Sequence, residues 1–249
     1  MPPFTAAVQA LPPPVHTVER APDRGPIYTE TDFSHTIVEP YNALSAALFL
    51  VVVIYWTRVL WGRFAQHRFL AAALPVLTIG AVGGTLYHAL RMWRGFLIMD
   101  YMPILLLALA AGVYFLRRLL GSLLAASGLV IVWFSVQGCF FYAVRHGYLA
   151  VPLHVSINLS YALLGLLVAG PIAAYLLRVD RQHAWRFAIA LCAFAAGLSF
   201  RYLDALRPPL LPMGTHFLWH LCGALAVYQC FALIYAVERP VPHAAPTEP

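Results

Sequence analysis

The sequence predicts an all-α integral membrane protein, a bundle of seven transmembrane helices, and three observations predict this fold class. Of its 249 residues, 61% are apolar and only 10% are charged, whereas about a quarter are charged in an ordinary soluble domain. The apolar residues form seven continuous blocks joined by short loops, and arginines stand between the blocks. Such a chain has too little polar surface to be stable in water.

Each apolar block is long enough to cross a membrane, because about 20 residues span about 30 Å of hydrocarbon as a helix. Strands of a β-barrel would instead alternate in polarity over about ten residues, so the continuous blocks favour helices. Short loops make neighbouring helices antiparallel. The predicted spans are 41–61, 69–90, 96–116, 120–142, 151–177, 185–202 and 214–237.

The charge distribution indicates membrane topology and no nucleic-acid binding. The formal charge is +6, and all 16 basic residues are arginines that lie between apolar blocks without forming a cluster. Three arginines closely follow the first predicted helix, which favours an N-terminus outside and a C-terminus inside. We predict a flexible proline-rich tail over residues 1–26, a membrane domain over 27–240, and a C-terminal tail over 241–249.

A few polar residues interrupt the apolar blocks, and at membrane depth such groups are costly unless they have partners. The alternation of antiparallel helices places the end of helix two, the starts of helices three, five and seven, and the end of helix six at one membrane face. The acidic N-terminal segment enters from the same face. One polar site built from many segments is therefore predicted. Its candidates are His88, Asp100, His154, Asn158, Arg201, Asp204, His216 and His220.

Three of these histidines predict a metal site. His216 and His220 are four residues apart, which places both imidazoles on one face of a helix, one turn apart. Together with His88 they supply three imidazoles and leave a fourth position open, as in a catalytic zinc site. The alternative is hydrogen-bonded packing between helices. We predict that His88, His216 and His220 bind zinc.

Asp100 interrupts the apolar stretch GFLIMDYMPILLL and needs a proton, a cation or a hydrogen-bond donor there. One interpretation is a salt bridge to Arg91, Arg94 or Arg201. The other is a catalytic role, in which the carboxylate supports a zinc ligand or acts as general base toward metal-bound water.

The remaining candidates each have a structural and a functional interpretation. Thr85 places a hydroxyl near the predicted site, although a threonine in a membrane helix often bonds to its own backbone. Arg201 and Asp204, three residues apart, either pair with each other or join the site. His154 and Asn158 open the fifth predicted helix, where a membrane interface commonly brings polar residues.

Four stretches, in order along the chain, resemble the motifs of one family. They are IVEPYNALSAALF at 37–49, GGTLYHALR at 83–91, DYMPI at 100–104 and GTHFLWHLCGALAVY at 214–228. They are similar to the Glu-led start of helix one, the helix-two histidine motif, the helix-three Asp motif and the helix-seven HxxxH motif of the alkaline ceramidases. These are seven-helix membrane zinc hydrolases related to the adiponectin receptors. The resemblance spans most of the chain.

The resemblance implies that His88, His216 and His220 bind zinc and that Asp100 assists the attacking water. It also implies a helix-two hydroxyl at the site, for which Thr85 is the candidate. The expected reaction is hydrolysis of the amide bond of a ceramide-like membrane lipid to a sphingoid base and a fatty acid. The chain departs from the family pattern four residues before His88, where Gly84 stands in place of a serine.

The acidic N-terminal segment is similar to a calcium site of the eukaryotic members of this family, although its spacing differs. Glu39 matches the family's glutamate before helix one, and Glu30 and Asp32 add oxygens of the kind that calcium prefers. The resemblance thus implies calcium at Glu30, Asp32 and Glu39. The alternatives are a solvated acidic loop, or a Glu39 side chain that caps helix one.

Three other functions fit the same residues. A seven-helix lipid-binding receptor would keep zinc as a structural ion without turnover. A haem protein would pair His88 or His154 with a helix-seven histidine across the ring, because axial ligands must face each other. A proton-coupled transporter would use the intramembrane acids and histidines as a relay.

Overall fold

The computed structural model describes residues 21–206 and 208–238, and the regular elements of this part are all helical. Seven α-helices are long and apolar enough to cross a membrane. This confirms the predicted seven-helix membrane bundle, whereas its orientation stays a prediction. The helices are α1 (Pro40–Leu60), α2 (Arg68–Leu90), α3 (Arg94–Leu120), α4 (Leu123–Arg145), α5 (Leu153–Arg178), α6 (Ala184–Asp204) and α7 (His216–Glu238), with a 3-10 turn, η1 (Arg181–His183), before α6.

The helix ends follow from local sequence, and α3 is longer than predicted for this reason. Its last turn carries Arg117 and Arg118, whose positive charges are favourable at a helix C-terminus. Gly121 then ends the helix in the left-handed conformation, with φ of 70°. Ser122 starts α4 directly, because its hydroxyl accepts a hydrogen bond from the backbone N–H of Ala125 at 3.2 Å.

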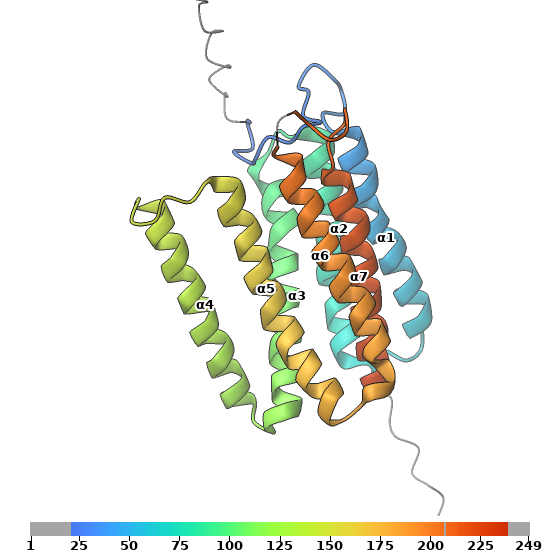
Figure 1. Cartoon of the computed structure of the whole chain (residues 1–249). Coiled ribbons are helices and arrows are strands. Elements are labelled where there is room, and N and C mark those ends of the chain that lie inside the picture. The colour runs from blue at the N-terminus through green and yellow to red at the C-terminus, as the bar shows by residue number, and fades with distance from the viewer. Residues whose placement is uncertain (1–20, 207, 239–249) are drawn as a thin grey trace, which may run out of the picture.

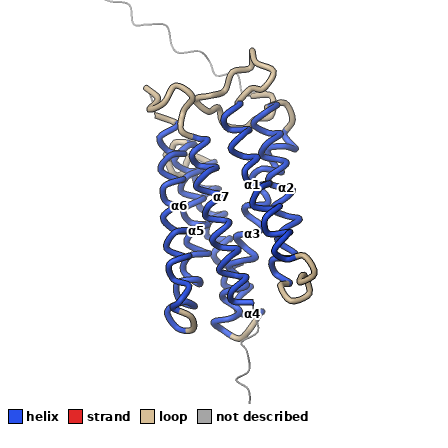
Figure 2. The backbone as a smooth tube through the Cα atoms, turned by 90° about the vertical axis from the view of Figure 1, so that its right-hand side faces the viewer, coloured by secondary structure: helices blue, strands red, loops and turns tan. Residues whose placement is uncertain are grey.

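Six of the helices form a ring, and α4 lies outside it. Around the ring α1 packs on α2, α2 on α3, α3 on α5, α5 on α6, α6 on α7 and α7 on α1, while α4 packs on α3 and α5. Figure 1 shows α4 at one edge of the bundle, and Figure 2 shows the same bundle after a quarter turn. The interior of the ring is therefore available for a cavity to which α4 contributes nothing.

A packed apolar core fixes the end of the ring opposite the predicted polar site. Five of its members come from different helices and are at most 3% exposed: Trp56, Leu70, Phe115, Ile172 and Leu233. In lipid such side chains stabilise the bundle through van der Waals contacts, because lipid tails are as apolar as the core, and close packing holds the helices in register. This core makes a rigid base for the polar end.

The N-terminal segment crosses the polar end of the bundle before α1 begins (Figure 1). Within it Ala21 and Asp23 are buried, at 2% and 0% exposure. The packed part of the chain thus begins before residue 27, where the sequence predicts the start of the domain. Residues 1–20 of the predicted N-terminal tail and the whole predicted C-terminal tail, 241–249, lie outside the described residues.

Candidate metal centre

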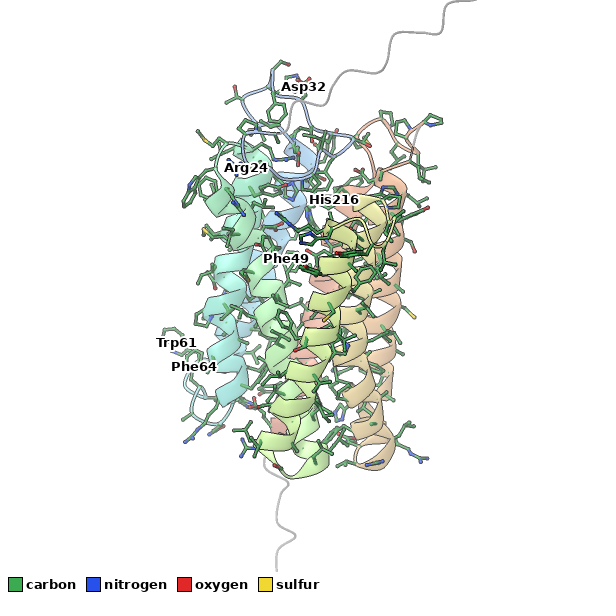
Figure 3. All side chains as sticks on the ribbon, turned by 90° about the vertical axis from the view of Figure 1, so that its left-hand side faces the viewer. Arg24, Asp32, Phe49, Trp61, Phe64 and His216 are labelled. Carbon is green, nitrogen blue, oxygen red and sulfur yellow. The ribbon has the colours of Figure 1, made fainter. Side chains whose placement is uncertain are left out.

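Two helices, α2 and α7, bring the predicted zinc ligands together at the polar end. His88 lies in the last turn of α2, His216 is the first residue of α7, and His220 lies one turn further along α7. Their ligand nitrogens all lie within 4.8 Å of one another, and each side chain is at most 5% exposed. Figure 3 shows His216 inside the bundle, below the segment that carries Asp32. The structure thus forms a buried three-histidine group that can hold a metal ion.

Two nitrogens of this group show why a metal suits it. His88 Nε2 and His216 Nδ1 are buried and have no hydrogen-bond partner in the structure, and buried polar atoms normally have one. Two zinc–nitrogen bonds of about 2.1 Å span about 4.2 Å at most, so a zinc ion would draw the imidazoles slightly closer. The three imidazoles therefore fit a zinc ion, which would satisfy both unpaired nitrogens.

Hydrogen bonds to the other ring nitrogens orient two of the imidazoles. His88 Nδ1 donates to Glu39 Oε2 at 2.5 Å, which leaves Nε2 as the free ligand atom. Ser45 Oγ donates its one hydrogen to the carbonyl of Asn42 at 3.0 Å, so it accepts from His220 Nδ1 at 2.8 Å. His220 Nε2 is then the ligand atom. Partners of this kind fix the tautomer and the ring orientation of metal ligands.

Glu39 connects the histidine group to the N-terminal segment. The carboxylate is fully buried and accepts hydrogen bonds from Thr31, Asn42 and Arg91 as well as from His88. Burial by itself raises the pKa of Glu39, but the bond with His88 and the charge of Arg91 outweigh it and lower the pKa below its ordinary value. Glu39 is therefore a charged carboxylate that stabilises its histidine partner.

Arg91, directly after α2, balances the charge of Glu39 from the other side. Its Nε donates to Asp23 Oδ2 at 2.7 Å, and its Nη1 donates to Glu39. The guanidinium also lies 4.6 Å from the ring centroid of Tyr87, a cation–π distance. Arg91 adopts φ of 49°, an uncommon conformation for a residue other than glycine. This ion-pair network replaces the predicted alternative in which Arg91 pairs with Asp100.

Asp100 lies next to the histidine group because α2 and α3 pack closely. A Cβ added at Gly83 would lie 2.2 Å from Cβ of Met99, so only glycine permits this approach. A Cβ added at Gly84 would lie 2.6 Å from Asp100 Oδ1. The carboxylate thus occupies the space that a serine at position 84 would need, which gives a physical reason for this departure from the ceramidase pattern. In the described chain Asp100 forms no ion pair.

An apolar cavity of about 250 Å³ extends from the histidine group into the ring of six helices. His220, Asp100 and Arg201 are the histidine and the charged residues of its lining. Every helix except α4 contributes, and the rest of the lining is mostly apolar, with Phe49 among its members (Figure 3). A cavity with an apolar wall and a few polar groups at one place is typical of a site for a small amphiphile.

Two other predicted site residues have structural partners instead. Thr85 Oγ1 donates to the carbonyl of Ala81 at 2.7 Å, so the backbone-bonded interpretation of this threonine is correct. Asp204 accepts from the backbone N–H groups of Thr215 and His216 at 2.7 and 3.1 Å and thereby caps the start of α7. The predicted Arg201–Asp204 ion pair does not occur among the described residues.

The predicted calcium ligands have separate roles. Glu30 accepts from the backbone N–H groups of Tyr41 and Asn42 and so caps α1, whereas the Glu39 side chain makes no capping bond. Asp32 is exposed and accepts from the hydroxyl and the backbone N–H of Ser34, which lower its pKa. In the described chain only the three histidines form a metal-binding group, so these carboxylates are not brought together.

His154 and Asn158 lie outside this centre. The ring of His154 packs 5.9 Å from that of Tyr202, and neither His154 nor Asn158 lines the cavity. The parity of antiparallel helices thus placed them at the correct membrane face but on the wrong side of α5. The depth of a side chain in the bundle follows from its position along the helix, whereas the direction in which it points depends on how the helices pack.

Sequence reasoning missed several residues of the centre, among them Ser45, Asn42, Asp23 and Tyr28. Glu39, Asn42 and Ser45 follow one another at intervals of three residues, and this polar stripe at the start of an apolar helix was the available signal. Tyr28 stacks on the ring of His216, with centroids 3.8 Å apart. Burial raises the pKa of Tyr28 and keeps the phenol neutral. No local pattern indicates Tyr28 or Asp23.

Comparisons with known proteins give no match from which a function could be inferred, so the functional proposal depends on the geometry of the site. No protein-family model matches the chain, and no curated protein matches it either. The structure has seven helices that are long and apolar enough to cross a membrane, a buried histidine group that can hold a metal ion, and an apolar cavity beside it. The candidate metal centre lies near one end of this bundle.

Proposed function

We propose that this protein is a zinc-dependent amide hydrolase of the membrane that acts on ceramide-like lipids. The observation that carries the proposal is the position of the three buried histidines, with Asp100 nearby, at an apolar cavity. A hydrolase that cleaves a lipid amide needs these parts together, namely a metal site, a proton carrier and a place for an alkyl chain. The order of motifs along the chain, which resembles the alkaline ceramidases, supports the same function.

The histidine group supports zinc in particular. Neutral imidazoles are common zinc ligands, and three of them leave the fourth position open, as in catalytic sites. A zinc ion bound by His88, His216 and His220 would lower the pKa of a coordinated water and polarise an amide carbonyl. Glu39 and Ser45 hold the His88 and His220 rings so that one nitrogen of each remains available.

Asp100 is the proposed proton carrier. Its carboxylate takes a proton from the attacking water and delivers it to the amide nitrogen as the carbon–nitrogen bond breaks. The products are a fatty acid, which carries the oxygen of the water, and a free amine. Among the described residues Asp100 forms no ion pair, so its oxygens are available for this transfer.

The apolar walls of the cavity support a lipid substrate. Side chains from α1, α2, α3, α5, α6 and α7 enclose it, and apolar ones such as Phe49, Leu107 and Ile172 form most of the lining. An alkyl chain placed there would be transferred between two apolar surroundings, lipid and protein. The position of the scissile amide is then set by the polar groups at the histidine end.

The test combines metal analysis with a hydrolysis assay on one purified sample. We expect about one zinc per chain, lost in His216→Ala, and release of fatty acid from labelled ceramides by wild type but not by Asp100→Asn. Asp32→Asn is the matched control, because this exposed aspartate bonds only to its neighbours. A metal-free wild type contradicts the proposal. Metal without hydrolysis would favour the lipid-binding receptor with a structural zinc.

A further inference from the structure

Arg201 is a second guanidinium near the histidine group, and it is half-buried where Arg91 is fully buried. Arg91 is paired with two carboxylates, Asp23 and Glu39. Arg201 lies in the last turn of α6 and forms no ion pair in the described part of the chain. Its positive charge is therefore not balanced by a carboxylate in direct contact.

Aromatic rings hold Arg201 in place. The guanidinium carbon lies 5.1 Å from the centroid of Tyr161 and 5.8 Å from that of Trp219. Cation–π contacts offset only part of the free energy that is lost when a cation is moved out of water. A bound anion in contact with Arg201 would supply the balancing negative charge that no carboxylate of the described chain provides by direct contact.

The cavity determines which anion could reach this guanidinium. Arg201, Tyr161 and Trp219 line the same apolar cavity as Asp100 and His220. A guanidinium binds a carboxylate through two parallel hydrogen bonds. Asp100 lines the same cavity, and a negative charge there repels a dianion such as a phosphate monoester more strongly than a carboxylate with one charge. The apolar walls select an alkyl chain attached to the anion.

We propose that Arg201 is the carboxylate-binding residue of the cavity and that the ligand is a single-chain lipid with one carboxylate. The inference rests on the proposed function only in linking this lipid to amide hydrolysis. The carboxylate has two sources in that chemistry. It belongs either to the fatty acid that hydrolysis releases or to the amine side of an N-acyl amino acid, which differs from a neutral ceramide in charge.

Equilibrium binding to the purified protein tests the proposal in two arms. The first compares palmitate with 1-hexadecanol, and the second compares N-palmitoylglycine with N-palmitoylethanolamine, so that each pair differs in the charged group. Each arm is measured on the protein as purified and after removal of metal with a chelator, because a bound metal would also attract a carboxylate. We expect wild type to prefer the carboxylate at least about tenfold, a difference of about 1.4 kcal/mol. The arm with the larger preference identifies the source.

Substitutions at Arg201 decide whether this residue is responsible. In the metal-free protein we expect Arg201→Met to bind each carboxylate and its uncharged partner equally, and Arg201→Lys to keep a reduced preference because an ammonium lacks the planar fork. Arg186→Met is the matched control, since Arg186 also lies on α6 and stacks on an aromatic ring, that of Trp185. It should behave as wild type.

Two results would overturn the proposal, namely no carboxylate preference in either arm for wild type, or an unchanged preference in the metal-free Arg201→Met and Arg201→Lys variants. Retained binding of 1-hexadecanol shows that a variant is folded. If Arg201→Met does not fold, the Arg201→Lys result decides. These binding experiments do not measure hydrolysis. A failure of the proposed enzyme activity would therefore not change the conclusion about carboxylate binding at Arg201.

Discussion

Glu39 accepts a hydrogen bond from His88 at 2.5 Å while it also pairs with Arg91, so one buried carboxylate links the N-terminal segment to the candidate metal centre. Glu39 and His88 are 49 positions apart in the sequence. A charged partner makes the imidazole more basic and holds its other nitrogen toward the metal. This relationship gives the first of four expectations.

Replacement of Glu39 by glutamine should weaken zinc binding about 10- to 100-fold, because the neutral amide is a poorer acceptor for His88 Nδ1–H. Competition with a zinc chelator measures the change. Glu30→Gln is the control, because Glu30 caps α1 and contacts none of the three histidines. It should lower stability by about 1 kcal/mol and leave zinc affinity unchanged. Equal zinc affinities in wild type and Glu39→Gln would show that the Glu39–His88 bond does not support metal binding.

Ser45, and not Thr85, should be the hydroxyl on which the centre depends. Ser45→Ala removes the acceptor of His220 Nδ1–H and leaves that group buried without a partner, which costs about 1–3 kcal/mol. We therefore expect weaker zinc binding in Ser45→Ala. Thr85→Val keeps the shape and removes only a bond to the carbonyl of Ala81, so zinc content and activity should stay at the wild-type level. The reverse pattern would place the functional hydroxyl at Thr85.

A methyl group at Gly84 should impair the chemistry without loss of the metal. The added Cβ would lie 2.6 Å from Asp100 Oδ1, so the carboxylate must turn away from its present position. Misplacement of a catalytic group by about 1 Å can lower the rate about 100-fold. We expect Gly84→Ala to retain zinc and to lose most lipid hydrolysis. Gly128→Ala in α4, where an added Cβ meets nothing within 4 Å, provides the control. Full activity in Gly84→Ala would argue against Asp100 as the proton carrier.

Removal of the Arg91 charge should destabilise the polar end of the bundle. Arg91→Met leaves the buried Asp23 without its ion-pair partner and leaves His88 as the ion-pair partner of Glu39. Loss of one partner of a buried ion pair costs about 3–5 kcal/mol. Thermal unfolding in detergent should show a clear decrease in Tm. Arg94→Met, at the exposed first position of α3, should unfold as wild type does.

A double-mutant cycle separates the pair from other effects of the Arg91 substitution. Asp23→Asn removes the charge that Arg91→Met leaves without an ion-pair partner, so the double variant should lose less stability than the sum of the single variants. Additive losses would mean that Arg91 and Asp23 do not interact in the folded protein. The same cycle tests whether the segment before residue 27 is part of the packed domain.

The histidine group could be predicted from sequence, because its position depends on spacing within single helices and on the number of membrane crossings. Apolar blocks of fixed length determine the number of helices, and the alternation of antiparallel helices determines the face at which each polar residue lies. The spacing of His216 and His220 fixes their common helix face. The same reasoning placed Asp100 at the correct depth. These features depend on distances along one helix or on a simple count of crossings.

The sequence by itself thus determined the membrane bundle, its polar end and the three histidines, whereas tertiary structure decided which neighbours serve them. Helix packing alone put Ser45 beside His220, turned Thr85 to its own backbone and placed α4 outside the ring. Helix packing also determined that Arg91 pairs with Asp23 and Glu39 and that Arg201 lines the cavity. The physical reason is that a helical period fixes depth and relative angle within one helix, while side-chain partners depend on how separate helices rotate against one another.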